Sequence, residues 1–350
     1  MSSEHSRAGR WVSLVALAAI ATLVLACNDR SAPPKWDAAS VGKSISSAPF
    51  TPVIANSNLG RGPTRLAVAL FQKDSTLVLQ AEVSARLFRL DNQPEQHPDT
   101  ATERGTYRFT ARTVDTADHG AMRFDRDAAG RTYADVALRA PSTAEPAAPA
   151  HDGALATIFT SMVDLNEAGM WSAQIDVKTG GKEYRSLLVT FAVSERTAEP
   201  AVGEPAPRTV QKLAKDVANL AEIDSSKTPN PELHSITVAD AIASGKPSVI
   251  AFVTPAFCQT RYCGPVMQTI VTPLHQQYRD RAHVIHIEPY DVALARRGTL
   301  TAVPATGEWN LRSEPFIAVL DRQGRVTAKF EGIIDLDEVK QALEAALAAK

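Results

Sequence analysis

Short runs of alternating apolar and polar residues constrain the fold of this chain more than any other sequence feature. Residues 79–87 carry an apolar side chain at every second position, and residues 107–111 and 171–177 repeat the pattern. Successive side chains of a β-strand point to opposite faces, so a period of two predicts strands with one buried face. The first half of the chain is therefore predicted to be antiparallel β-sheet.

Two glycines mark a hairpin in this half. Thr179-Gly180-Gly181-Lys182 separates the run at 171–177 from a further strand-like run at 187–193. Several short strands without helices between them are typical of a β-sandwich of immunoglobulin-like type, which we expect over residues 51–195. The histidines there, His97, His119 and His151, lack metal-ligand spacing. We interpret this region as a binding or spacer module.

The second half has the pattern of an α/β sheet. Residues 248–253 and 284–287 are continuous apolar runs, as expected of strands buried on both faces. Residues 316–320 and 326–330 predict a strand pair, and residues 336–349 an amphipathic helix. Residues 196–232 are interpreted as a linker that contains a short helix, because apolar residues recur at three and four positions over 210–223.

The chain has three cysteines, too few for a disulfide-dense scaffold. Two of them, Cys258 and Cys263, follow the first continuous apolar run of this half. Residues five apart within one α-helix lie about 8 Å apart, whereas a disulfide spans roughly 4.4–6.8 Å between Cα atoms. The pair can therefore bridge only if the helix starts at or after Cys263. Gly264 and Pro265 favour that start, and Arg261 between the cysteines would favour a thiolate.

This pattern resembles the thioredoxin fold over residues 233–350, with a cysteine loop after a strand, a β-α-β half and a ββα half. Pro315 precedes the last strand pair, where that family carries its cis-proline. The family's second cysteine is replaced by Val266, so the pair here is Cys-x4-Cys. The resemblance implies disulfide exchange, with Cys258 as nucleophile, Cys263 as resolving thiol and Pro315 shaping the substrate groove.

Three alternatives stay open for the cysteine pair. In the first alternative, the pair forms a structural disulfide in a redox-inactive binding protein. A thiol peroxidase is similar in its Thr-Pro segment, although Pro255 stands where that family has Thr, and Thr254 is one step earlier. A copper chaperone would add His275, His283 or His286 to the thiolates, but we interpret these histidines as packing or surface residues.

The N-terminus has the pattern of an export signal. Arg7 and Arg10 precede an apolar run over residues 11–26, about the length of a signal-peptide core. The Ala26-Cys27 end of this run resembles the lipobox of bacterial lipoproteins, which implies removal of residues 1–26 and lipidation of Cys27. Residues 27–50, rich in Ser, Ala and Pro, are interpreted as a tether.

The net charge of -2 provides no basic field for nucleic acid. We therefore expect a lipid-anchored protein on the periplasmic or cell-surface face of a membrane. It would reduce disulfides of exported proteins with electrons from a membrane donor. No cofactor and no metal are expected.

Overall fold

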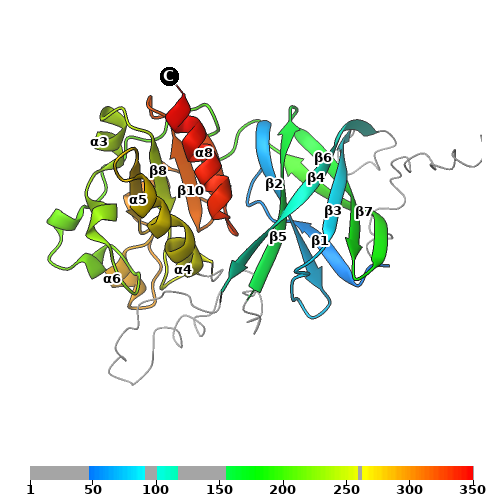
Figure 1. Ribbon diagram of the computed structural model, residues 1–350, viewed down its shortest axis with the longest axis horizontal. Coiled ribbons are helices and arrows are strands. Elements are labelled where there is room, and N and C mark those ends of the chain that lie inside the picture. Colours follow the sequence, from blue (N-terminus) through cyan, green and yellow to red (C-terminus); the bar gives the residue numbers. More distant parts are fainter. Residues whose placement is uncertain (1–46, 91–100, 117–154, 259–261, 350) are drawn as a thin grey trace, which may run out of the picture. The chain divides into compact units, whose positions relative to one another are not determined.

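The structure of the chain is a computed structural model that describes residues 47–90, 101–116, 155–258 and 262–349 (Figure 1). The predicted signal peptide with Cys27, most of the predicted tether, the three histidines of the first half and Arg261 lie outside these ranges. Within them, no helix is long and apolar enough to cross a membrane.

Seven strands of the first half form one antiparallel sheet in the order β1-β2-β5-β4-β3-β6-β7. The strands are β1 (Phe50–Ile54), β2 (Gly62–Gln72), β3 (Glu82–Leu90), β4 (Ala101–Asp115), β5 (Leu155–Leu165), β6 (Gly169–Thr179) and β7 (Lys182–Val193). The three alternating runs lie in or overlap β3, β4 and β6. The prediction of antiparallel strands is confirmed.

The sheet is nearly closed around a single core. Phe50 in β1 packs edge-on against Tyr184 in β7, with ring centroids 5.1 Å apart, so the two edge strands meet. All seven strands contribute apolar side chains to the core, among them the fully buried Phe159 and Trp171.

Strand β4 connects the two parts of this sheet. Its residues 101–109 pair with β3, whereas its residues 110–115 pair with β5. One long strand therefore carries the hydrogen-bonded ladder from one part of the sheet to the other. The immunoglobulin-like type is not confirmed by this continuous sheet.

The predicted hairpin turn connects β6, which ends at Thr179, to β7, which begins at Lys182. Gly180 and Gly181 have φ angles of 54° and 73°. Two successive residues with positive φ are typical of the type I′ turn, which follows the right-handed twist of paired strands. Glycine adopts these angles without the steric penalty that a Cβ atom brings.

A second, four-stranded sheet has the order β11-β10-β8-β9. Strands β8 (Ser248–Phe252) and β9 (His283–Ile287) are parallel, and β10 (Phe316–Leu320) runs antiparallel to β8 and to β11 (Val326–Glu331). Every residue of β8 and β10 is buried, which accounts for their continuous apolar sequence.

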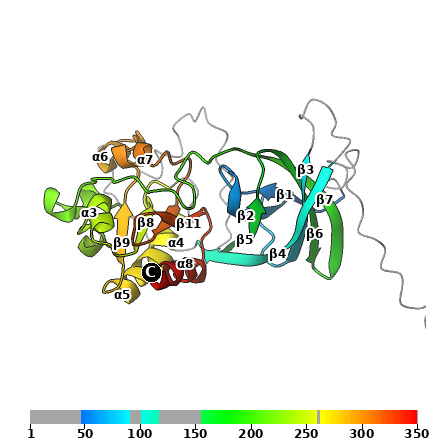
Figure 2. The ribbon, with the colours of Figure 1, turned by 90° about the horizontal axis from the view of Figure 1, so that it is seen from above.

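Helices cover both faces of this sheet (Figure 2). They are α3 (Val238–Ala243), α4 (Cys263–Val266), α5 (Thr272–Tyr278), α6 (Val292–Ala295), α7 (Pro304–Glu308) and α8 (Leu336–Ala348). Val249 and Ala251 of β8 pack with α4, α5 and α8, whereas Ile250 and Phe252 pack with α3 and α7. A π-helical turn, η5 (Met267–Val271), joins α4 to α5, so the helical segment that begins at Cys263 continues through Pro273 to Tyr278.

The predicted helix over 210–223 is wrong. This segment holds two 3₁₀ turns, η2 (Ala214–Asp216) and η3 (Leu220–Glu222), and Val217 between them is extended. Val210, which a helix would place on its apolar face, is 76% exposed. The side chain of Asn219 accepts a hydrogen bond from the N–H of Ala221 and starts a new turn instead. A third turn, η4 (Pro231–His234), follows.

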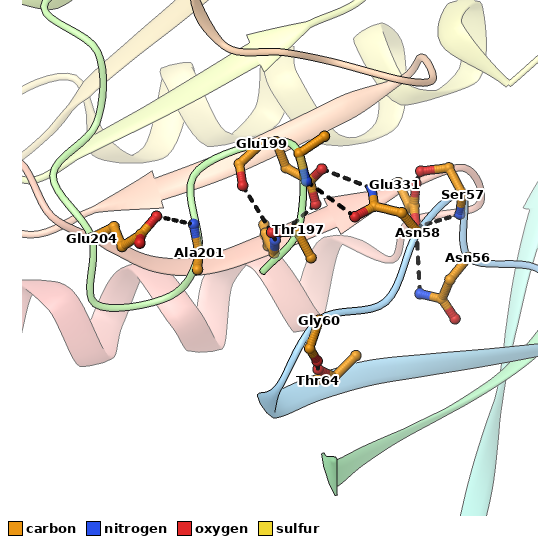
Figure 3. Close-up of polar contacts among 12 residues, drawn as sticks. Asn56, Ser57, Asn58, Gly60, Thr64, Thr197, Glu199, Ala201, Glu204 and Glu331 are labelled. Carbon is orange, nitrogen blue, oxygen red and sulfur yellow. Dashed lines mark hydrogen bonds and ion pairs between the residues drawn. The ribbon is translucent and has the colours of Figure 1, made fainter. Parts of the chain in front are cut away.

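Polar contacts link the loop after β1 to residues that precede or belong to the second sheet (Figure 3). Glu199 accepts hydrogen bonds from Asn58 Nδ2 and Lys329 Nζ, each at 2.7 Å. The carboxylate of Glu331 accepts from the backbone N–H and the hydroxyl of Ser57. Residues 38–350 form one compact unit, so the division into two domains stays a prediction.

Candidate functional site

The two cysteines lie next to each other where α4 begins. Cys258 lies in the loop that follows β8, and Cys263 is the first residue of the helix. The backbone N–H of Cys263 donates a hydrogen bond to Sγ of Cys258, with an N–S distance of 3.3 Å. The helix therefore starts at the residue that the geometric argument required. The two cysteines do not form a disulfide in the structure, and Cys258 is partly exposed while Cys263 is fully buried.

The surroundings of Cys263 keep its thiol protonated. Burial raises the pKa of Cys263 well above its ordinary value, and the hydrogen bond and charge of Cys258 raise it further. A backbone hydrogen bond from Thr254 lowers this pKa and the charge of Glu314 raises it, both to a smaller extent. The pair is thus asymmetric in access and in acidity.

The segment that precedes β10 reaches the same place. The Glu314–Pro315 peptide bond is cis, and the pairing of Phe316 with Phe252 sets Pro315 beside the residue that opens the cysteine loop. The hydroxyl of Tyr290 donates to Glu314 Oε2 at 3.1 Å. Burial raises the pKa of Tyr290, and the charges of Glu314 and of both cysteines raise it further. The sequence pattern does not reveal Tyr290, since it stands in no motif.

Gly264 and Pro265 are buried in the first turn of α4. A proline there costs no intrahelical hydrogen bond, because the first four N–H groups of a helix have no partner in it. The Pro265 carbonyl also accepts a hydrogen bond from the hydroxyl of Thr269 at 2.8 Å. The supporting role of both residues stays a prediction.

The three histidines considered as copper ligands each have a partner other than the cysteines. His275 Nε2 lies 2.6 Å from a carboxylate oxygen of Glu232, and His283 Nε2 lies 3.0 Å from the hydroxyl of Ser244. His286 Nε2 lies 2.8 Å from the carbonyl oxygen of Val253. These contacts do not favour the copper alternative.

His286 also belongs to a buried polar cluster that the sequence pattern does not reveal. Its Nδ1 lies 3.6 Å from Asp224 Oδ2 and 3.3 Å from His234 Nε2, and these last two atoms are 3.1 Å apart. The side chains are at most 2% exposed. Asp224 lies in the loop after η3 and His234 in η4, so no regular spacing connects them to His286 in β9.

Burial opposes charge on all three groups of this cluster, and their mutual attraction overcomes it for Asp224 and His286 but not for His234. Burial would raise the pKa of Asp224, but the charge of His286 and the hydrogen bonds of both histidines hold it well below its usual range. Burial would lower the pKa of His286, but Asp224 raises it to about 8. For His234, burial prevails and lowers the pKa.

Glu288 lies beside this cluster at the end of β9. Its Oε2 accepts a hydrogen bond from the backbone N–H of Ser225 at 3.0 Å. Burial raises the pKa of Glu288 to about 7, although the charge of His286 and the backbone hydrogen bond of Ser225 lower it in part. Neither Oε1 of Glu288 nor Oγ1 of Thr254 completes a hydrogen bond within the described residues. A cavity of about 300 Å³ is lined by His234, His286, Glu288 and Tyr290, among others.

No protein-family model and no curated protein matches the chain. Among solved structures, a thioredoxin-like protein in the oxidized form, determined in solution, is 16% identical, with a TM-score of 0.24 over 29% of this chain and 78% of its own. A crystal structure of a thioredoxin-like superfamily protein is 15% identical, with a TM-score of 0.24 over 33% of this chain and 88% of its own. Likenesses at this TM-score say nothing about the function of this chain.

Proposed function

We propose that the protein is a lipid-anchored, extracytoplasmic thiol-disulfide oxidoreductase that reduces disulfides of exported proteins. The observation that carries the proposal is the hydrogen bond from the Cys263 N–H to Sγ of Cys258 at the start of α4. A donor aimed at sulfur favours the thiolate, which is the attacking species in disulfide exchange. Cys258 is also the more exposed of the two cysteines, so it is the sulfur that a substrate reaches.

The reaction proceeds in two exchanges. The Cys258 thiolate attacks one sulfur of the substrate disulfide and forms a mixed disulfide, while the other substrate sulfur leaves as a thiolate. Cys263 then gives up its proton to a departing thiolate and attacks Sγ of Cys258. The second substrate thiol is released, and the Cys258–Cys263 disulfide remains. Two electrons pass to the substrate, and a membrane dithiol donor restores the pair.

The buried position of Cys263 suits the resolving role. Its raised pKa keeps it protonated, so it does not compete with Cys258 for the substrate before the mixed disulfide forms. Pro315, beside the start of the cysteine loop, would line the groove in which the substrate chain lies.

Reduction of insulin disulfides by the purified full chain in detergent, with a small-thiol reductant, tests the exchange. Cys258→Ser and Cys263→Ser should each abolish turnover, but only Cys263→Ser should accumulate a mixed disulfide with insulin on a non-reducing gel. If the wild-type chain shows no turnover, the proposal is contradicted and the cysteine pair is interpreted as a structural disulfide. Peroxide consumption that needs Cys258 alone would show a thiol peroxidase.

The anchor and location are tested separately. We propose that Cys27 carries the lipid and becomes the first residue after removal of residues 1–26. Mass spectrometry of the mature N-terminus should find a diacylglyceryl-modified Cys27, and an unmodified cysteine contradicts the anchor. Protease added to spheroplasts should digest the protein if it faces the extracytoplasmic side.

A further inference from the structure

Three lone-pair atoms converge in the buried cluster at the distances of a metal coordination sphere. Asp224 Oδ2, His234 Nε2 and His286 Nδ1 are separated by 3.1, 3.3 and 3.6 Å. Zinc binds nitrogen and oxygen at about 2.0–2.2 Å in tetrahedral sites, so its ligand atoms lie about 3.3–3.6 Å from one another. Two of the three separations fall in this range and the third, 3.1 Å, is slightly shorter, so a small shift would place the three atoms at three corners of such a tetrahedron.

Outer hydrogen bonds hold two of these groups in the orientation that a metal requires. The backbone N–H of Ser226 donates to Asp224 Oδ1 at 2.8 Å, which leaves Oδ2 directed at the histidines. His286 Nε2 donates to the carbonyl of Val253 at 2.8 Å, so in the neutral ring Nδ1 carries the lone pair. Ligating histidines commonly donate their second N–H in this way.

The cluster also borders a space for a fourth ligand. The cavity of about 300 Å³ is lined by both histidines and by Glu288. Glu288 is 5% exposed, and its Oε1 has no hydrogen-bond partner within the described residues. A water or small ligand bound to a metal from the cavity side would offer this oxygen a donor. Three protein ligands with an open position are typical of catalytic rather than structural zinc sites.

We propose that Asp224, His234 and His286 bind one divalent transition-metal ion, zinc foremost, with the fourth position open toward the cavity. Two imidazoles and one carboxylate suit Zn²⁺ and neighbouring first-row ions rather than Ca²⁺ or Mg²⁺, which prefer oxygen ligands. The site uses neither cysteine and does not depend on disulfide exchange. Two contacts link it to the cysteine loop: the Val253 carbonyl orients His286, and the N–H of Ala256 donates to the hydroxyl of Ser225 beside Asp224.

Zinc titration of the metal-free full chain tests the proposal, with both Cys258 and Cys263 replaced by Ser so that neither thiolate of this pair competes. One equivalent should bind. Asp224→Asn, His234→Gln and His286→Gln should each weaken binding by at least about 100-fold, more than the 10–100-fold typical of a lost outer-shell partner. The matched control His275→Gln replaces a histidine that is also buried and paired with a carboxylate, and it should leave the affinity unchanged.

Cobalt spectroscopy on the intact cluster keeps the test valid if a variant fails to fold. Co²⁺ added to the chain with both cysteines replaced should give the visible bands of a tetrahedral site, without a thiolate charge-transfer band. An absence of stoichiometric Zn²⁺ and Co²⁺ binding overturns the proposal, as does binding that is unaffected by all three cluster variants. Insulin reduction by the wild-type chain after chelation reports on disulfide exchange alone, so failure of one proposal is distinguishable from failure of the other.

Discussion

The backbone nitrogen of Cys263 lies 3.3 Å from the sulfur of Cys258. This contact joins the first residue of a helix to the sulfur that the solvent reaches, while the sulfur of Cys263 is enclosed by the core under α4. Two cysteines in one short loop thereby acquire different chemistry.

Selective alkylation should report this asymmetry. We expect iodoacetamide to modify Cys258 in the reduced chain and to leave Cys263 unmodified up to pH 9.0, because the pKa of Cys263 lies well above that value. Peptide mass spectrometry after digestion measures both sites. In Cys258→Ser, Cys263 should react only once denaturant is added. Equal labelling of both cysteines in the native chain would contradict the assignment of roles.

Glu314→Gln should make Cys263 more acidic. The negative charge of Glu314 raises the pKa of Cys263 and of Tyr290, and an amide of the same shape removes that charge. Ultraviolet titration of thiolate and tyrosinate should show both pKa values shifted down. Glu308→Gln, which changes a carboxylate that bonds Thr209 instead, is the control. Unchanged titration in Glu314→Gln would show that Glu314 does not act on the pair.

Removing one partner of the Arg65–Glu338 ion pair should strongly destabilise the fold. Nε and Nη2 of Arg65 donate to the two oxygens of Glu338 at 3.0 and 2.8 Å, and the side chains are 7% and 12% exposed. Arg65→Met leaves the buried carboxylate of Glu338 with only the weaker contacts of Arg112 Nε at 3.4 Å and the Thr160 hydroxyl at 3.2 Å. The variant should therefore lower the free energy of unfolding by up to about 3–5 kcal/mol.

Urea denaturation measures this loss. The double variant Arg65→Met/Glu338→Leu should recover most of it, since neither charge is then left unpaired. The exposed pair Lys178–Glu82 supplies the comparison, and Lys178→Met should have little effect. A small loss in Arg65→Met would mean that the charge of Glu338 is satisfied by other groups.

Glu199 should contribute to stability at neutral pH but not in acid. Burial would raise the pKa of Glu199, but the charge and hydrogen bond of Lys329 and the hydrogen bond of Asn58 hold it below 4.5. A carboxyl whose pKa is lowered by folding stabilises the protein above its unfolded pKa, and this stability is lost as the pH falls through the folded value.

Glu199→Gln should therefore lower the free energy of unfolding at neutral pH, and the difference from wild type should shrink as the pH falls below 4.5 and through the lowered folded pKa of Glu199. Urea denaturation at a series of pH values gives both quantities. A difference that stays constant with pH would assign the effect to packing rather than to charge.

Local patterns determined much of this protein. The period-two runs predicted strands, the two glycines predicted the turn between β6 and β7, and the continuous apolar runs predicted β8, β9 and β10. The spacing of Cys258 and Cys263 also limited where α4 begins. These features depend on residues close together in the chain, where side-chain direction and backbone sterics act within a few positions.

Only the tertiary structure decided what brings distant residues together. The near closure of the first sheet depends on contacts between its first and last strands. The absence of the predicted helix over residues 210–223 depends on which of their side chains the core buries. The buried polar cluster forms because a loop, a 3₁₀ segment and a strand bring together Asp224, His234 and His286. No regular spacing in the sequence predicts this cluster. Burial then sets Cys263 apart from Cys258, because exposure and pKa are properties of the packed surroundings.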